Sequence, residues 1–164
     1  MKQNISLRQR ALNILARCEI SRAELAKKLM PHCGSEAELN QLLDELAEKH
    51  WQSDSRFTES YVHSKSRLHG NLRLQYTLAQ KGIDEQTIRD YLPSKQQQMI
   101  AAAAVIHKKF RQPPSNLQEK HKYMRFLAYR GFEMDIIQAA LRQAWLPETD
   151  DDVCLAEERL PENE

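Results

Sequence analysis

The sequence has few of the residues that build phosphate loops, β-sheets or disulfide frameworks. Four glycines occur in 164 residues, and they are too scattered to form a Gly-rich phosphate loop. Only three valines are present and no stretch alternates with period two, which argues against a sheet. The three cysteines include no Cys-x-x-Cys pair, so we expect free thiols in a reducing compartment.

Long apolar runs and catalytic motifs are missing as well. The first ten residues lack the apolar core of a signal peptide, and the longest apolar stretch, 99–106, is far too short to span a membrane. No His-Glu-x-x-His pair, serine nucleophile elbow or recognisable carboxylate pair occurs. We therefore expect a cytoplasmic protein that is not an enzyme, with no catalytic residue, no metal ligand and no cofactor.

Helix signals, in contrast, are dense. Five serines are each followed three residues later by Glu or Gln, the pattern of a capping box at a helix start. Gly34, Gly82 and Gly131 each follow a helical pattern, where a left-handed residue often ends a helix. The five pairs are Ser6/Gln9, Ser21/Glu24, Ser35/Glu38, Ser94/Gln97 and Ser115/Gln118.

These signals predict an all-α fold. The expected helices cover residues 6–18, 21–31, 35–50, 54–68, 71–81, 84–92, 95–110, 116–130 and 134–146.

A repeat underlies the helices. At an offset of 49 residues, Lys81-Gly82-Ile83 aligns with Arg130-Gly131-Phe132, although the first unit has its glycine one place later, at Gly34. Matching apolar positions alone would arise in any set of amphipathic hairpins, but the shared turn favours duplication. The aligned apolar sets are Leu25/Leu74/Tyr123, Leu29/Leu78/Leu127, Leu39/Ile88/Ile137 and Leu43/Leu92/Leu141.

We therefore predict three tandem three-helix units, at 1–52, 53–93 and 94–147, stacked into an elongated, modular body. Residues 148–164 form an acidic tail that we expect to be disordered. Charge also differs between the body and the tail. The first 147 residues carry 23 bases and 15 acids, whereas the tail carries eight acids and one base. Such asymmetry points to nucleic acid or to a charged partner.

Bases gather on the second helix of units two and three and just before Gly70. Bases with aromatic residues between them, as around Phe110, suit phosphate contact and base stacking or an acidic protein groove. A merely solvated helix face is the alternative for each residue. A helix-turn-helix reader is disfavoured, because the third helices of units one and two are acidic and would be repelled by phosphate. The candidate partner-binding residues are Lys65, Arg67, Arg73, Lys81, Lys122, Arg125 and Arg130.

Several of these bases lie in a segment that resembles a known family. Asp54-Ser55-Arg56-Phe57, Tyr61, Ser64-Lys65-Ser66-Arg67, Gly70, Arg73-Leu74, Leu78 and Gln80-Lys81-Gly82-Ile83 resemble the central signature of the RecX family. Residues 125–132 resemble that family's C-terminal repeat. The likeness covers residues 6–146 and leaves out the acidic tail.

This resemblance implies a three-repeat helical protein that lies in the groove of the RecA recombinase filament on single-stranded DNA. We also expect a monomer that binds double-stranded DNA weakly. Such proteins modulate, usually by inhibition, the filament's ATPase, strand exchange and coprotease activities. It supports Arg67, Arg73, Lys81, Arg125 and Arg130 as motif positions. Two alternatives remain: a sequence-independent DNA-binding protein that needs no recombinase, and a helical adaptor for another protein.

The acidic tail generates a first prediction. Deleting residues 148–164 removes a net charge of −7 that can compete with phosphate for the basic body. The truncated protein should bind DNA more tightly at low salt while its melting temperature changes little. Fluorescence anisotropy with a labelled oligonucleotide measures this, and equal affinity of the two proteins would contradict it.

Overall fold

All regular structure that the computed structural model describes, over residues 5–146, is helical, as the sequence predicts. The start of the chain and the acidic tail lie outside the described residues. The elements are α1 (Leu7–Leu15), α2 (Arg22–Leu29), the 3-10 turn η1 (Met30–His32), α3 (Glu36–Glu48), α4 (Asp54–Lys65), α5 (Asn71–Gln80), α6 (Glu85–Tyr91), α7 (Lys95–Phe110), α8 (Leu117–Tyr129) and α9 (Met134–Gln143).

Serine side chains start the helices at four of the five predicted positions. Ser6, Ser21, Ser35 and Ser94 each accept a hydrogen bond from the backbone N–H three residues on. Only Ser94 forms the full reciprocal box, in which its own N–H donates to Gln97. These bonds satisfy helix N–H groups that would otherwise lack a partner.

The fifth predicted box, Ser115/Gln118, is wrong by one residue. Asn116 is the N-cap of α8, and its side chain accepts from the N–H of Glu119 at 2.9 Å. The Glu119 carboxylate in turn accepts from the N–H and hydroxyl of Ser115, both at 2.8 Å. Asparagine caps as well as serine does, and the acidic residue three places later favours its register.

Two of the three predicted glycine turns are confirmed. Gly82 and Gly131 adopt φ values of 78° and 85° after α5 and α8. The expectation for Gly34 is wrong, because α2 runs into η1, which contains Pro31, and leaves it through an extended residue rather than a left-handed one.

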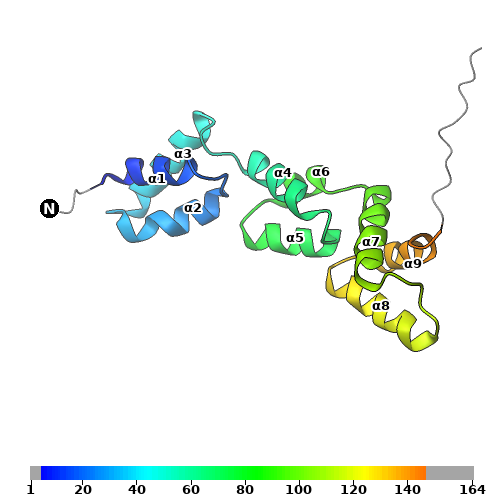
Figure 1. Cartoon of the computed structure of the whole chain (residues 1–164). Coiled ribbons are helices and arrows are strands. Elements are labelled where there is room, and N and C mark those ends of the chain that lie inside the picture. Colours follow the sequence, from blue (N-terminus) through cyan, green and yellow to red (C-terminus); the bar gives the residue numbers. More distant parts are fainter. Residues whose placement is uncertain (1–4, 147–164) are drawn as a thin grey trace, which may run out of the picture.

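The nine α-helices of the described part form three groups of three, α1–α3, α4–α6 and α7–α9, arranged in an elongated body (Figure 1). Each group has its own apolar core. The first three predicted apolar sets are buried in all three units, whereas Leu92 and Leu141 of the fourth set are only half-buried.

The second helices of the groups, α2, α5 and α8, follow one another along one side of the body (Figure 1, lower side). The start of α2, residues 21–24, contacts the turn after α5, residues 81–83, and we call this contact the first joint. There the Ser21 hydroxyl donates to the Lys81 carbonyl at 2.7 Å, and the Lys81 ammonium pairs with Glu24 at 2.6 Å. The Asp54 carboxylate accepts from the N–H of Arg22 at 2.8 Å.

The second joint repeats this arrangement between residues 70–73, at the start of α5, and residues 130–132, after α8. The Gly70 N–H donates to the Arg130 carbonyl at 2.9 Å, and the Leu72 N–H donates to the Gly131 carbonyl at 3.1 Å. The N–H between them, of Asn71, donates to the Gln98 side chain at 2.8 Å. A Cβ on Gly70 would overlap the backbone of Gly131, so glycine is required there for a close approach.

Both joints therefore bring the start of one helix against the end of another and align positive with negative ends of the helix dipoles. Backbone N–H groups make the bonds at the second joint, whereas the Ser21 hydroxyl makes the bond to the turn at the first. Three of the four buried polar side chains in the described part lie in the same places. Ser21 lies in the first joint, Gln98 in the second, and Gln52 donates to the Ile20 carbonyl beside the first. Because buried polar groups need partners, these contacts fix how neighbouring units sit.

The second joint is most sensitive to substitution of Gly131. In Gly131→Ala, the methyl group would meet Arg73 at about 2.5 Å, and a non-glycine residue at this φ costs about 1–3 kcal/mol by itself. We expect the free energy of unfolding in urea to fall by at least about 2 kcal/mol. Gly34→Ala is the matched control, because φ is not positive there and the methyl group meets only the end of the Glu38 side chain. Equal stability of the two variants would contradict this account.

Candidate functional site

Positive charge increases along the body. Residues 5–52 carry seven bases and seven acids, whereas residues 94–146 carry nine bases and three acids. Ion pairs follow the opposite trend, because most of those in the described part lie within unit one or at the first joint. The third unit therefore has a surplus of basic side chains that its own carboxylates cannot neutralise.

The candidate bases differ in whether they form an ion pair with a carboxylate. Among the described residues, Lys81 alone of the seven forms an ion pair, with Glu24. Its ammonium also lies 5.8 Å from the centre of the Phe57 ring, so it belongs to the first joint more than to an open face. The other six have no carboxylate partner within residues 5–146; they are Lys65, Arg67, Arg73, Lys122, Arg125 and Arg130.

Side chains of α5 and α8 form a continuous candidate face. Arg73, Lys122 and Arg125 are exposed, while leucines of the same helices are buried in the cores. Two tyrosines lie among these bases with little cover: Tyr76 is 65% exposed and Tyr129 is 83% exposed. The structure thus places cations and uncovered aromatic rings together, as single-stranded nucleic acid binding requires.

The aromatic residue that the sequence singled out in this region has another role. Phe110 is half-buried, and its ring stacks on Tyr123 at 3.8 Å between centroids and meets Phe126 edge-on at 5.4 Å. The Lys122 ammonium lies 5.8 Å from the same ring. Phe110 therefore packs against the third core rather than standing out as an exposed ring, which corrects the expectation for it.

Four basic groups meet around the second joint. Lys65 comes from the end of α4, Arg73 from the first turn of α5 and Arg130 from the turn after α8, and the positive charges of all three act on His69. Burial of His69, followed by the positive charges of Arg73, Arg130 and Lys65, lowers its pKa below the 6.5 of a solvated imidazole. Its buried Nδ1 atom has no hydrogen-bond partner in the structure.

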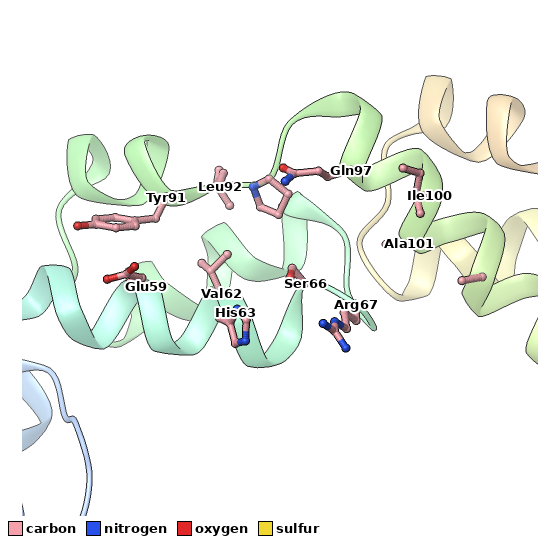
Figure 2. Close-up of a pocket in the computed structure, with 12 residues that line it drawn as sticks. Glu59, Val62, His63, Ser66, Arg67, Tyr91, Leu92, Gln97, Ile100 and Ala101 are labelled. Carbon is pink, nitrogen blue, oxygen red and sulfur yellow. The ribbon is translucent and has the colours of Figure 1, made fainter. Parts of the chain in front are cut away.

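Arg67 lies elsewhere, at an apolar groove of about 580 Å³ between α4, the end of α6 and α7 (Figure 2). Ile100, on α7, also lines the groove and is 60% exposed, which is unusual for an isoleucine. The lining side chains belong to Glu59, Val62, His63, Ser66, Arg67, Tyr91, Leu92, Pro93, Gln97, Ile100, Ala101 and Ala104.

Neither this groove nor His69 was predicted from the sequence. The groove forms where two units meet, so no local pattern marks it. No local pattern marks His69 either. The two arginines near it could have been found, because the 49-residue offset aligns Arg73 with Glu24 and Arg130 with Lys81 and thus puts two cations where the first unit has an acid and a base.

Two classes of site find no support in residues 5–146. No group of three or more histidine, cysteine or acidic side chains is arranged to hold a metal ion there. In the same range, no helix is both long and apolar enough to cross a membrane.

The same arrangement of helices occurs in solved structures. A crystal structure of RecX from Lactobacillus salivarius matches with a TM-score of 0.77 at 23% identity, over 88% of this chain and 98% of that one. Family models described as the second and third three-helix domains of RecX match residues 53–92 and 96–141. The chain is thus an all-helical protein of tandem three-helix domains.

Curated relatives extend this likeness over most of the chain. "Regulatory protein RecX" of Neisseria gonorrhoeae is 55% identical over 145 residues, which cover 88% of this chain and 95% of that protein. The protein of the same name from Chromobacterium violaceum is 43% identical over 83% of this chain and 89% of its own length. The chain belongs to the RecX family of regulatory proteins.

The lowered pKa of His69 generates a prediction for stability. In the unfolded chain this histidine takes up its proton near pH 6.5, and in the folded chain only at lower pH. Between those values the unfolded state binds more protons, so stability falls as pH falls below about 6.5. Urea unfolding of the wild type and of His69→Gln between pH 7.5 and 5 measures the effect. The variant should lose less stability on acidification, and parallel curves would contradict the assignment.

Proposed function

We propose that this protein binds the RecA recombinase filament on single-stranded DNA and lowers its ATPase, strand-exchange and coprotease activities. Membership of the RecX family supports this role. The observation that carries the proposal is the exposed basic face of α5 and α8, which Arg73, Lys122 and Arg125 present without carboxylate partners among the described residues.

An elongated body can contact a long partner surface over a greater length than a compact body can. The two joints connect neighbouring units, and α5 and α8 follow each other along one side of the body (Figure 1). Both helices carry exposed bases. A binder that contacts neighbouring protomers needs no chemistry of its own. It shifts the filament toward the state that it binds better, by as much as its affinities for the two states differ.

A sequence-independent DNA-binding protein that acts without a recombinase is the second candidate. Tyr76 and Tyr129 favour it, because exposed rings beside cations can stack on bases of any sequence. Salt separates the two candidates. The affinity of a pure phosphate binder falls linearly on a plot of log K against log salt, with a slope of about −0.7 per phosphate contact on a single strand.

DNA-dependent ATP hydrolysis by the cognate recombinase tests the proposal. The wild-type protein should lower the rate at substoichiometric amounts, because one copy contacts several protomers or blocks growth of the filament. The double variant Lys122→Glu/Arg125→Glu should lose most of this inhibition, since like charges facing each other across an interface can cost several kcal/mol. Both side chains are exposed, so stability should change by about 0.5 kcal/mol or less for each.

The matched control is Lys27→Glu/Lys28→Glu. These two lysines are also exposed on a second helix, α2, and their reversal changes the net charge by the same amount. The control should keep the inhibition, because the first unit carries no surplus of bases. If wild-type protein at equimolar amounts leaves the ATPase rate unchanged, the proposed function is wrong. If the folded Lys122/Arg125 variant inhibits normally, this face is only solvated surface.

A further inference from the structure

The two joints lie at equivalent positions of the repeat but differ in their charges. The 49-residue offset relates Glu24 to Arg73 and Lys81 to Arg130. At the first joint these positions hold an ion pair of 2.6 Å, whose side chains are only 26% and 31% exposed. At the second joint both positions are arginines.

The backbone segments that carry the two arginines of the second joint are tightly packed against each other. A Cβ placed on Gly131 would lie about 2.5 Å from both the Cβ and the N of Arg73, and Gly131 directly follows Arg130. The positive charges of Arg73, Arg130 and Lys65 each contribute to the lowered pKa of His69. The joint thus concentrates like charges that repel one another, and their mutual repulsion opposes folding.

No group within residues 5–146 neutralises this cluster. The Arg130 guanidinium donates to the Leu68 carbonyl at 3.1 Å and lies 4.8 Å from the centre of the Phe126 ring. The Arg73 guanidinium lies 6.0 Å from the centre of the Tyr129 ring. These contacts position the two arginines but bring no negative charge. Within the described residues, the second joint therefore has no carboxylate that corresponds to Glu24 at the first joint.

We propose that the second joint binds a phosphate group, which Arg73 and Arg130 hold between them with Lys65 and His69 beside them. The phosphate takes the place of the missing carboxylate and so tightens the contact between units two and three. Arginine suits this ligand because its planar fork can make paired hydrogen bonds to phosphate oxygens. The inference deepens the proposed function, on which it rests for the source of the phosphate.

A nucleic-acid backbone is the source that the surroundings favour. Tyr129 directly precedes Arg130, is 83% exposed and has the Arg73 guanidinium over its ring. A nucleotide whose phosphate occupies the joint therefore has an uncovered ring within reach for its base. The bases of α8 continue the positive surface from there.

Arg73→Glu is the informative variant, because it gives the second joint the charges of the first. A glutamate at this position can pair with Arg130 as Glu24 pairs with Lys81. Without ligand, the melting temperature should stay the same or rise. Affinity for a fluorescein-labelled oligo(dT), measured by anisotropy at low salt, should fall on the order of tenfold or more.

Stabilisation by ligand gives a second readout, since a ligand that binds only the folded state raises the melting temperature. Oligo(dT) should raise the melting temperature of the wild type and leave that of Arg73→Glu unchanged. Inorganic phosphate, compared with chloride at equal ionic strength, should act in the same direction at higher concentration. If free phosphate stabilises the wild type and oligo(dT) does not, the strand backbone is not the source and the inference is overturned.

Arg89→Glu is the control for net charge in the same unit. Arg89 is exposed on α6, away from the joint, and its 3.8 Å contact with Glu85 is weak. This variant should bind oligo(dT) within about threefold of the wild type, because long-range charge effects are screened. A loss as large as that of Arg73→Glu would overturn the phosphate site.

The ATPase assay separates failure of this inference from failure of the proposed function. If Arg73→Glu binds oligo(dT) as the wild type does but no longer inhibits the recombinase, the joint contacts protein, and the phosphate site is wrong while the proposed function stands. If the wild type does not inhibit but Arg73→Glu still loses oligo(dT) binding, the proposed function fails and the site stands. A variant that melts well below the wild type would overturn the argument from charge repulsion.

Discussion

The whole architecture depends on one repeated contact, in which the start of a second helix meets the carbonyl groups that end the next one. A helix start leaves N–H groups without partners, and a helix end leaves carbonyl groups without partners. At the second joint, Gly70 and Leu72 donate to Arg130 and Gly131, so each end satisfies the other. Units of this size have small cores, five buried apolar residues in the smallest cluster, and gain little stability alone. Contacts between units therefore contribute to folding as well as to shape.

The contact also explains why the same short turn serves structure and candidate function together. Gly82 and Gly131 are needed for their positive φ and because the neighbouring chain lies where a side chain would be. The residue before each glycine, Lys81 or Arg130, must be long enough to reach across the joint. At the first joint this cation forms an ion pair with Glu24, whereas at the second joint it has no carboxylate partner among the described residues. The joints also differ in their hydrogen bonds, because the Ser21 hydroxyl bonds to the turn at the first joint and the Gly70 N–H does so at the second.

Local rules account for the features that the sequence predicted correctly. Helix positions and buried apolar sets follow from periodicity and from caps such as Ser6 and Ser94, whose partners lie three residues away. Predictions failed where two local signals competed, as Asn116 did with Ser115, or where a proline changed the turn, as before Gly34. The candidate site was predicted only in part. The pairing of Lys81 with Glu24 joins residues 57 positions apart, and neither residue is unusual in its own helix.

The start of α8 differs from those of α2 and α5, because its hydrogen bonds within the described residues stay inside its own unit: Asn116 caps Glu119, and Glu119 accepts from Ser115. At the other end of the row, α2 finishes in η1 rather than in a glycine turn. The first unit thus supplies only a helix start to a joint, the third supplies only a turn, and the middle unit supplies both. This makes the middle unit the one module that could be copied in tandem with both of its contacts preserved. A longer relative built on this plan would arise by duplication within residues 53–93, whereas extra copies of either outer unit would have no complementary surface to join.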